Sequence, residues 1–229
     1  MTESLAKNRR LFSPALIFAL IVFVLLAIDI WLVVSGLTQA ADERVMEAFY
    51  SVRSGPLTAF FRVITFCGNT YSLLGLCILV IILPGRMKIG VPVALMVAVG
   101  SIAQTVLKAI VARPRPDQGL WLISLSDNEL YQSFPSGHAN ASLIFWLALA
   151  ILLGRSLTRG NRPAPEGRRF AAGFFGVIFV ALAMLIAVSR LYLGVHYATD
   201  VLGGWLLAGL VLILGFLAYD RLWPAKWRL

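Results

Sequence analysis

The chain has 229 residues, of which 59% are hydrophobic and only 14% are charged, and its formal net charge is +9. A soluble domain averages about 45–50% apolar and about 25% charged residues, so this composition excludes a soluble enzyme or a soluble nucleic-acid-binding domain. No linker or internal repeat divides the sequence. It therefore predicts one integral-membrane domain over residues 1–229.

The apolar stretches predict the fold class. A helix needs about 20 residues to span the hydrocarbon core of a bilayer. Stretches of suitable length predict an all-α, polytopic protein with six transmembrane helices at residues 14–35, 64–84, 90–112, 136–154, 170–189 and 196–219. The second stretch contains the polar run from Cys67 to Thr70, so we expect an interfacial helix to lead into a shorter span there.

Most basic residues lie on one side of these spans. Of the 20 Lys and Arg residues, 13 lie before the first span, between the second and third, between the fourth and fifth, or after the sixth. Cytoplasmic loops of membrane proteins carry an excess of Lys and Arg. We therefore expect a plasma (inner) membrane protein with cytoplasmic N- and C-termini. The positive net charge is then explained by the basic cytoplasmic segments and does not indicate a nucleic-acid partner.

Polar residues at the opposite ends of spans three to six form a second group. Ionisable side chains in or near a membrane are costly and usually functional. With both termini inside, spans three and five run outward and spans four and six run inward, so the group shares one layer that faces the periplasm or the exterior. Its members are Lys108, Arg115, Ser136, Gly137, His138, Ser189, Arg190, His196 and Asp200. Asp29, near the outer end of the first span, is expected either to extend its carboxylate to the membrane surface or to pair helices, rather than to take part in catalysis.

Three cations in this layer suit a phosphate group. Lys108, Arg115 and Arg190 can neutralise and hold a tetrahedral oxyanion. On one continuous helix Lys108 and Arg115 would project on nearly the same face, whereas Arg113 would point elsewhere. The prolines on either side of Arg115 must interrupt that helix, so the shared face is only a suggestion.

The start of the fourth span offers a second way to hold an anion. Ser136 resembles an N-cap, and Gly137 would let an anion approach the free N–H groups of the first helical turn. The alternative is a plain helix cap. His138, two residues after Ser136, favours the functional interpretation because an imidazole there can donate a proton to a leaving oxygen.

The sequence contains only two histidines, His138 and His196. His196 lies four residues before Asp200, so on a helix the two side chains would be neighbours. A carboxylate that accepts a hydrogen bond from one ring nitrogen leaves the other nitrogen available as a nucleophile or base. The pair could instead be a metal site or a structural hydrogen bond. Three nearby cations would repel a divalent metal, so we expect no metal and no other cofactor.

Three segments follow one another along the chain: Lys108-x6-Arg115-Pro116, Pro135-Ser136-Gly137-His138 and Ser189-Arg190-x5-His196-x3-Asp200. They resemble the three-part signature of the type 2 phosphatidic acid phosphatase superfamily, which includes bacterial phosphatidylglycerophosphatase B and undecaprenyl pyrophosphate phosphatases. The resemblance covers residues 108–200, and every signature position is present.

This resemblance implies a metal-independent hydrolase that removes a phosphate from a phospholipid or a polyprenyl (pyro)phosphate through a phosphohistidine intermediate. His196 would attack phosphorus, Asp200 would orient His196, and His138 would protonate the leaving oxygen. The residues that bind the substrate phosphate would be Lys108, Arg115, Ser136, Gly137 and Arg190.

The expected substrates are phosphatidylglycerophosphate, phosphatidic acid or undecaprenyl pyrophosphate held in the bilayer. No nucleic acid and no obligate protein partner are expected. The alternative function is a carrier that moves a phosphorylated lipid or solute through the bundle. Carriers usually have repeats or broken helices near the middle of the membrane, whereas this polar set lies in one layer, so the hydrolase is the preferred hypothesis.

Overall fold

A computed structural model describes residues 13–84, 86–125, 132–158 and 164–224. These residues form α-helices and one short 3-10 helix, η1 (Gln118–Leu120), and no strand, which confirms the predicted all-α class. Within the described ranges, five helices are long and apolar enough to cross a membrane. They are α2 (Pro14–Val34), α6 (Met87–Val111), α7 (Gly137–Thr158), α8 (Glu166–Tyr192) and α9 (Ala198–Leu222).

The second predicted span consists of two helices, α4 (Gly55–Phe66) and α5 (Thr70–Ile82), with a bend of 51° between them. Asn69 caps α5, because its side-chain oxygen accepts a hydrogen bond from the Ser72 N–H at 2.7 Å. Gly68 lies in the break, where a Cβ would overlap the side chain of Ile186 on α8. The expected break in this region is therefore present, and the described part of the chain has six candidate spans if the bent pair crosses as one.

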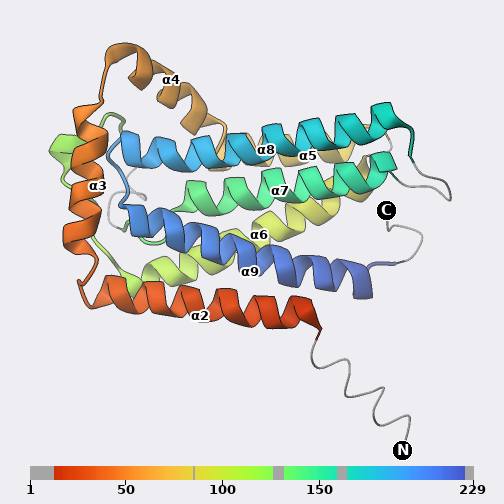
Figure 1. The fold of residues 1–229 in the computed structure, drawn as a ribbon, viewed down its shortest axis with the longest axis horizontal. Helices are drawn as coiled ribbons and strands as arrows, with labels where there is room; N and C mark the ends of the chain where they lie inside the picture. The colour runs from red at the N-terminus through yellow and green to blue at the C-terminus, as the bar shows by residue number, and fades with distance from the viewer. Residues whose placement is uncertain (1–12, 85, 126–131, 159–163, 225–229) are drawn as a thin grey trace, which may run out of the picture.

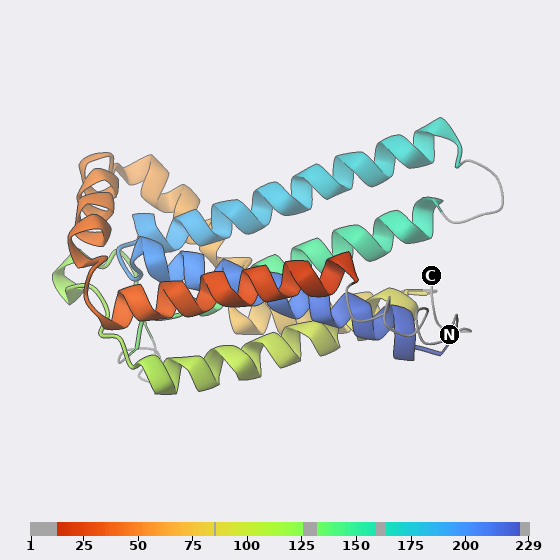
Figure 2. The same cartoon turned by 60° about the horizontal axis from the view of Figure 1, so that its bottom comes forward.

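The spans lie side by side, and α3 (Gln39–Ser51) lies across one end of them (Figure 1). The central helix, α7, packs against α6, α8 and α9. In both views α2 runs along α9 (Figure 1 and Figure 2). At this contact Asp29 is only 4% exposed, and a Cβ at Gly203 would lie 2.9 Å from its Oδ2 atom. Asp29 thus lies between two helices, which agrees with helix pairing and not with extension to the membrane surface.

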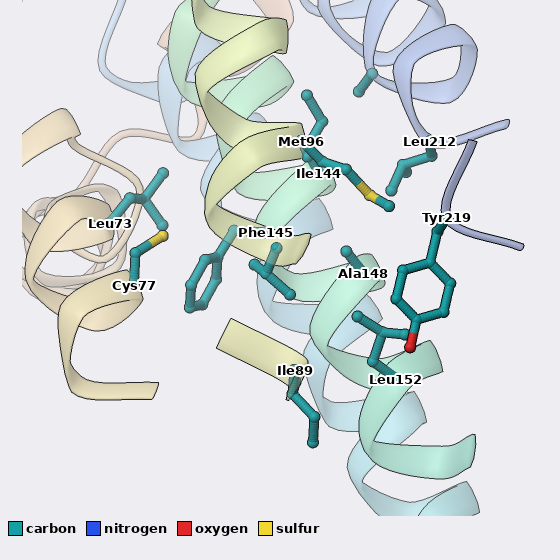
Figure 3. Packing of buried hydrophobic residues seen from close by; sticks show 12 residues of the cluster. Leu73, Cys77, Ile89, Met96, Ile144, Phe145, Ala148, Leu152, Leu212 and Tyr219 are labelled. Atoms are coloured by element: carbon teal, nitrogen blue, oxygen red, sulfur yellow. The ribbon is translucent and has the colours of Figure 1, made fainter. Parts of the chain in front are cut away.

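Buried side chains of α5, α6, α7 and α9 form the main apolar core (Figure 3). Ile144, Phe145 and Leu152 of α7 are fully buried there. Many large apolar side chains of α2 and α8 are instead exposed on the outside of the bundle. This is typical of helices surrounded by lipid, since lipid tails are as apolar as Leu. Both cysteines, Cys67 and Cys77, are free.

Candidate active site

All the predicted site residues lie at the end of the bundle where α3 crosses it (Figure 1). Lys108 is in the last turn of α6 and Arg190 is in the last turn of α8. The other members come from the segment after α6, from the start of α7, and from the start of α9 with the residues before it: Arg115, Ser136, Gly137, His138, His196 and Asp200. The layer that the sequence predicted is therefore present in the fold.

His196 lies between a carboxylate and a guanidinium. Its Nδ1 atom is 3.4 Å from Oδ2 of Asp200, and its Nε2 atom is 3.2 Å from Nη1 of Arg115. The imidazole is 2% exposed. If Nδ1–H donates to Asp200, the lone pair of Nε2 points towards Arg115 and the cation cluster. This tautomer is the one that a nucleophilic histidine needs.

Arg115 reaches the site from a turn and not from a helix. Helix α6 ends at Val111, and Ala112 is left-handed with φ 48°. Arg115 lies three residues after Ala112, and its Nη1 atom also donates to the carbonyl oxygen of Val195 at 2.7 Å. The suggestion that Lys108 and Arg115 share one helical face is therefore wrong, because the helix stops between them.

The charges of the site act together on His196. Burial, and then the positive charges of Arg115, Arg190 and Lys108 and the nearby His138, lower the pKa of His196 well below its usual range. The imidazole is therefore neutral near neutral pH. These four residues therefore lie near enough to His196 for their charges to act on its ring. Among the residues that the structure describes, no three His, Cys, Asp or Glu side chains group as metal ligands.

The start of α7 is joined directly to the start of α9. Ser136 is fully buried and its N–H donates to the carbonyl oxygen of Asp200 at 2.9 Å. Its hydroxyl oxygen accepts from the Ala139 N–H at 3.5 Å, which agrees with the predicted N-cap. A Cβ at Gly204 of α9 would lie 2.8 Å from the Ser136 carbonyl oxygen, so this glycine permits the close approach. These contacts place His138 and Asp200 on adjoining helix starts.

The other two predicted cations, Lys108 and Arg190, also have hydrogen-bond partners. Nζ of Lys108 donates to the carbonyl oxygen of Gln132 at 3.0 Å. Arg190 is 2% exposed, and its Nη1 atom donates to Oγ1 of Thr65 on α4 at 2.8 Å. A Cβ at Gly68, in the break after α4, would lie 3.5 Å from Cδ2 of His138. The break between α4 and α5 therefore supports the site, a role that the sequence did not reveal.

An ion network behind Asp200 was also missed. Arg113 pairs with Oδ1 of Asp200 at 2.8 Å and with Oδ2 of Asp42 on α3 at 2.7 Å. Asp42 also accepts from the N–H and hydroxyl of Thr199, at 3.0 and 2.6 Å. Burial lowers the pKa of Arg113, but the charges of Asp200 and Asp42 outweigh this and raise it above the ordinary value. Arg113 and Arg115 thus bind different partners, although not for the predicted reason of a shared helix, and Arg113 holds the carboxylate that contacts His196.

Known proteins resemble this chain over most of its length. A model of the PAP2 superfamily matches residues 89–224. Phosphatidylglycerophosphatase B of Bacillus subtilis is 30% identical over 186 residues, which cover 80% of this chain and 85% of that protein. Lipid A 1-phosphatase of Rhizobium etli is 27% identical over 130 residues, or 55% of this chain and 48% of that protein. The crystal structure of a transmembrane PAP2 type phosphatidylglycerolphosphate phosphatase from Bacillus subtilis superposes with a TM-score of 0.75 at 26% identity, covering 89% of this chain and 96% of that one.

Proposed function

Because the chain belongs to the PAP2 superfamily, we propose that it is a membrane lipid phosphatase that works through a phosphohistidine intermediate. The observation that carries this proposal is the position of His196, whose two ring nitrogens contact Asp200 and Arg115. A carrier has no need of a histidine that is oriented in this way. Family membership favours the hydrolase over the carrier.

In the first step Nε2 of His196 attacks phosphorus, and the bond from phosphorus to the lipid oxygen breaks. His138 gives a proton to that leaving oxygen. Asp200 accepts the Nδ1–H of His196 and stabilises the positive charge that develops on the ring. The products are a phosphohistidine and the lipid alcohol, or the lipid monophosphate if the substrate is a diphosphate.

In the second step water attacks the phosphohistidine. The neutral His138 takes a proton from the water, inorganic phosphate leaves, and Nε2 of His196 regains its lone pair. Negative charge spreads over the equatorial phosphoryl oxygens in both transition states. This negative charge is balanced by Lys108, Arg115 and Arg190 and by the N–H groups of the first turn of α7. The proposed reaction therefore needs no metal ion.

The proposed substrate is a lipid phosphate whose headgroup reaches the α3 end of the bundle while its tail stays in the bilayer. Phosphatidylglycerophosphate, phosphatidic acid and undecaprenyl pyrophosphate all meet this description. The excess of basic residues at the opposite ends of the spans supports an inner-membrane protein with cytoplasmic termini and an outward-facing site.

The two histidine variants test this scheme. His196→Ala removes the nucleophile, so it should abolish both turnover and the phosphoenzyme that alkaline quenching preserves. His138→Ala should lower the rate of release from a lipid phosphate by roughly 10²–10⁴-fold, the usual worth of general acid–base help. A nitrophenyl phosphate has a good leaving group, so its phosphorylation step should be largely spared. Phosphate found on His138 in the His196→Ala protein would overturn the assignment.

A further inference from the structure

Two side chains of α6, Gln104 and Lys108, bind the segment that leads into α7. They are four residues apart, so they lie on the same side of the helix, with Gln104 about 6 Å further from the helix end. Nζ of Lys108 donates to the carbonyl oxygen of Gln132, and Nε2 of Gln104 donates to the carbonyl oxygen of Pro135 at 3.2 Å. Lys108 belongs to the predicted phosphate site, whereas Gln104 lies outside all three signature segments.

The segment that Gln104 contacts is buried but not helical. Phe134, Pro135 and Ser136 are all buried, and α7 begins only at Gly137. Buried backbone N–H and C=O groups outside regular structure need hydrogen-bond partners elsewhere. Proline has no N–H, so its carbonyl oxygen is the only backbone group that can bind a partner. Gln104 is the partner of that oxygen.

The carbonyl of Pro135 and the N–H of Ser136 belong to one peptide group, which is held from both sides. Its C=O accepts from Gln104 on α6, and its N–H donates to the carbonyl oxygen of Asp200 on α9 at 2.9 Å. A peptide group is planar, so these two bonds fix its orientation between the two helices. Because Ser136 caps α7, the same orientation sets the direction of the first N–H groups of that helix.

Gln104 also lies against the first residue of α7. A Cβ at Gly137 would lie 3.5 Å from both Cδ and Nε2 of Gln104, which is ordinary van der Waals contact. The carboxamide therefore occupies the side of Gly137 from which a side chain would project. Replacing the carboxamide would change the hydrogen bond to Pro135 and the packing against Gly137 at the same time.

We propose that Gln104 is a positioning residue that aligns the first turn of α7 with the phosphoryl group. The N–H groups of that turn stabilise negative charge only where they point at the phosphoryl oxygens. Gln104 acts through the peptide group of Pro135 and Ser136 and needs no contact with the substrate. This inference rests on the proposed function and adds a residue to the support of the same site.

Gln104→Met tests the role of the amide, because methionine has a similar length but cannot donate a hydrogen bond. The full-length protein is assayed in mixed micelles for kcat and KM with phosphatidic acid and for the inhibition constant of vanadate. A displacement of about 1 Å in a catalytic site can cost about 100-fold. We therefore expect kcat/KM to fall by roughly 10–100-fold. The inhibition constant of vanadate should rise on the same scale, because vanadate mimics the transition state.

The matched control is Thr105→Val, at the next position of α6. Thr105 is exposed, and its hydroxyl donates to the carbonyl oxygen of Ser101 within the same helix at 3.0 Å. Thr105→Val therefore also removes a hydrogen bond from α6, but not one to the segment before α7. It should change neither kcat/KM nor the inhibition constant of vanadate.

The inhibition constant separates positioning from a purely structural role. A variant that is only less stable has fewer active molecules, so its apparent kcat falls while KM and the inhibition constant stay the same. That result for Gln104→Met would overturn the inference, as would unchanged kinetics. Gln104→Leu also lacks the donor and should show the same rise. If neither variant gave folded protein, Gln104 would hold the bundle and not the turn, and the inference would again be wrong. Absence of phosphate release by the unmodified protein would instead reject the proposed function.

Discussion

Replacing Arg113 with Gln tests whether the ion network behind Asp200 holds the site together. The side chain of Arg113 is 7% exposed, and the two carboxylates that it pairs with, Asp42 and Asp200, are 1% and 0% exposed. Removing one partner of a buried ion pair costs about 3–5 kcal/mol, because the other charge stays buried without compensation. Arg113→Gln leaves two buried carboxylates without their ion-pair partner. We therefore expect this variant to lose unfolding free energy at the upper end of that range.

Asp42→Asn provides a graded comparison. It leaves Arg113 paired with Asp200 and weakens only the hydrogen bonds on the α3 side, which predicts a loss of about 1–3 kcal/mol. The control is Arg155→Gln, which breaks an exposed ion pair with Asp220 whose members are 38% and 54% exposed. An exposed pair contributes at most about 1 kcal/mol.

The assay is unfolding in mixed micelles with increasing denaturing detergent, followed by helical content, together with kcat for a lipid phosphate. We expect the loss of unfolding free energy to be largest for Arg113→Gln, smaller for Asp42→Asn and smallest for Arg155→Gln. In Arg113→Gln kcat should also fall, because Asp200 no longer has the partner that fixes its carboxylate. A loss for Arg113→Gln no larger than that for Arg155→Gln would refute the reasoning.

Three further predictions concern topology, metal and pH. In a cysteine-free background, Gln118→Cys should react with an impermeant thiol reagent on intact cells and Thr158→Cys should not; the opposite pattern would reject the outward-facing site. Excess chelator should leave activity intact and vanadate should inhibit it, whereas activity that returns only with a divalent ion would establish a metal enzyme. Because the pKa of His196 is lowered from 6.5, kcat/KM should fall on the acid side only below about pH 6.5. Arg115→Gln removes a positive charge and so raises the pKa of His196, which moves this loss to higher pH, while Arg155→Gln should not move it.

The sequence predicted the parts of the site that depend on topology. Hydrophobic stretches and loop charges placed His138 and His196 in one layer, because the direction of each span follows from the positive-inside rule. The contact between His196 and Asp200 was expected from their spacing on one helix. His196 instead precedes α9, which begins at Ala198, so the contact forms at the start of the helix and not between two of its turns. These inferences need only local patterns along the chain.

The supporting contacts were not predictable in the same way. Asp42 lies in α3, a polar helix far from the signature in sequence, and its partner Arg113 belongs to a segment without helical periodicity. Thr65 and Gly68 support Arg190 and His138 only because the chain breaks between α4 and α5. One feature of the sequence did point to the role of Arg113. Residues 113–116 repeat Arg-Pro, and only one of these two arginines was assigned to the phosphate, which left the other available for a supporting role.

The packing of α2 along α9 also constrains how the protein matures during synthesis. A membrane chain emerges from its N-terminal side, so α2 enters the bilayer long before α9 has been made. Until then Asp29 lacks the backbone of Gly203 against which it packs, and Arg113 lacks one of its two carboxylates. His196 and Asp200 arrive with the same late segment. The proposed nucleophile, the carboxylate beside it and the contact with α2 therefore all depend on the last helix, and we expect a nascent chain that ends before α9 to have no hydrolytic activity.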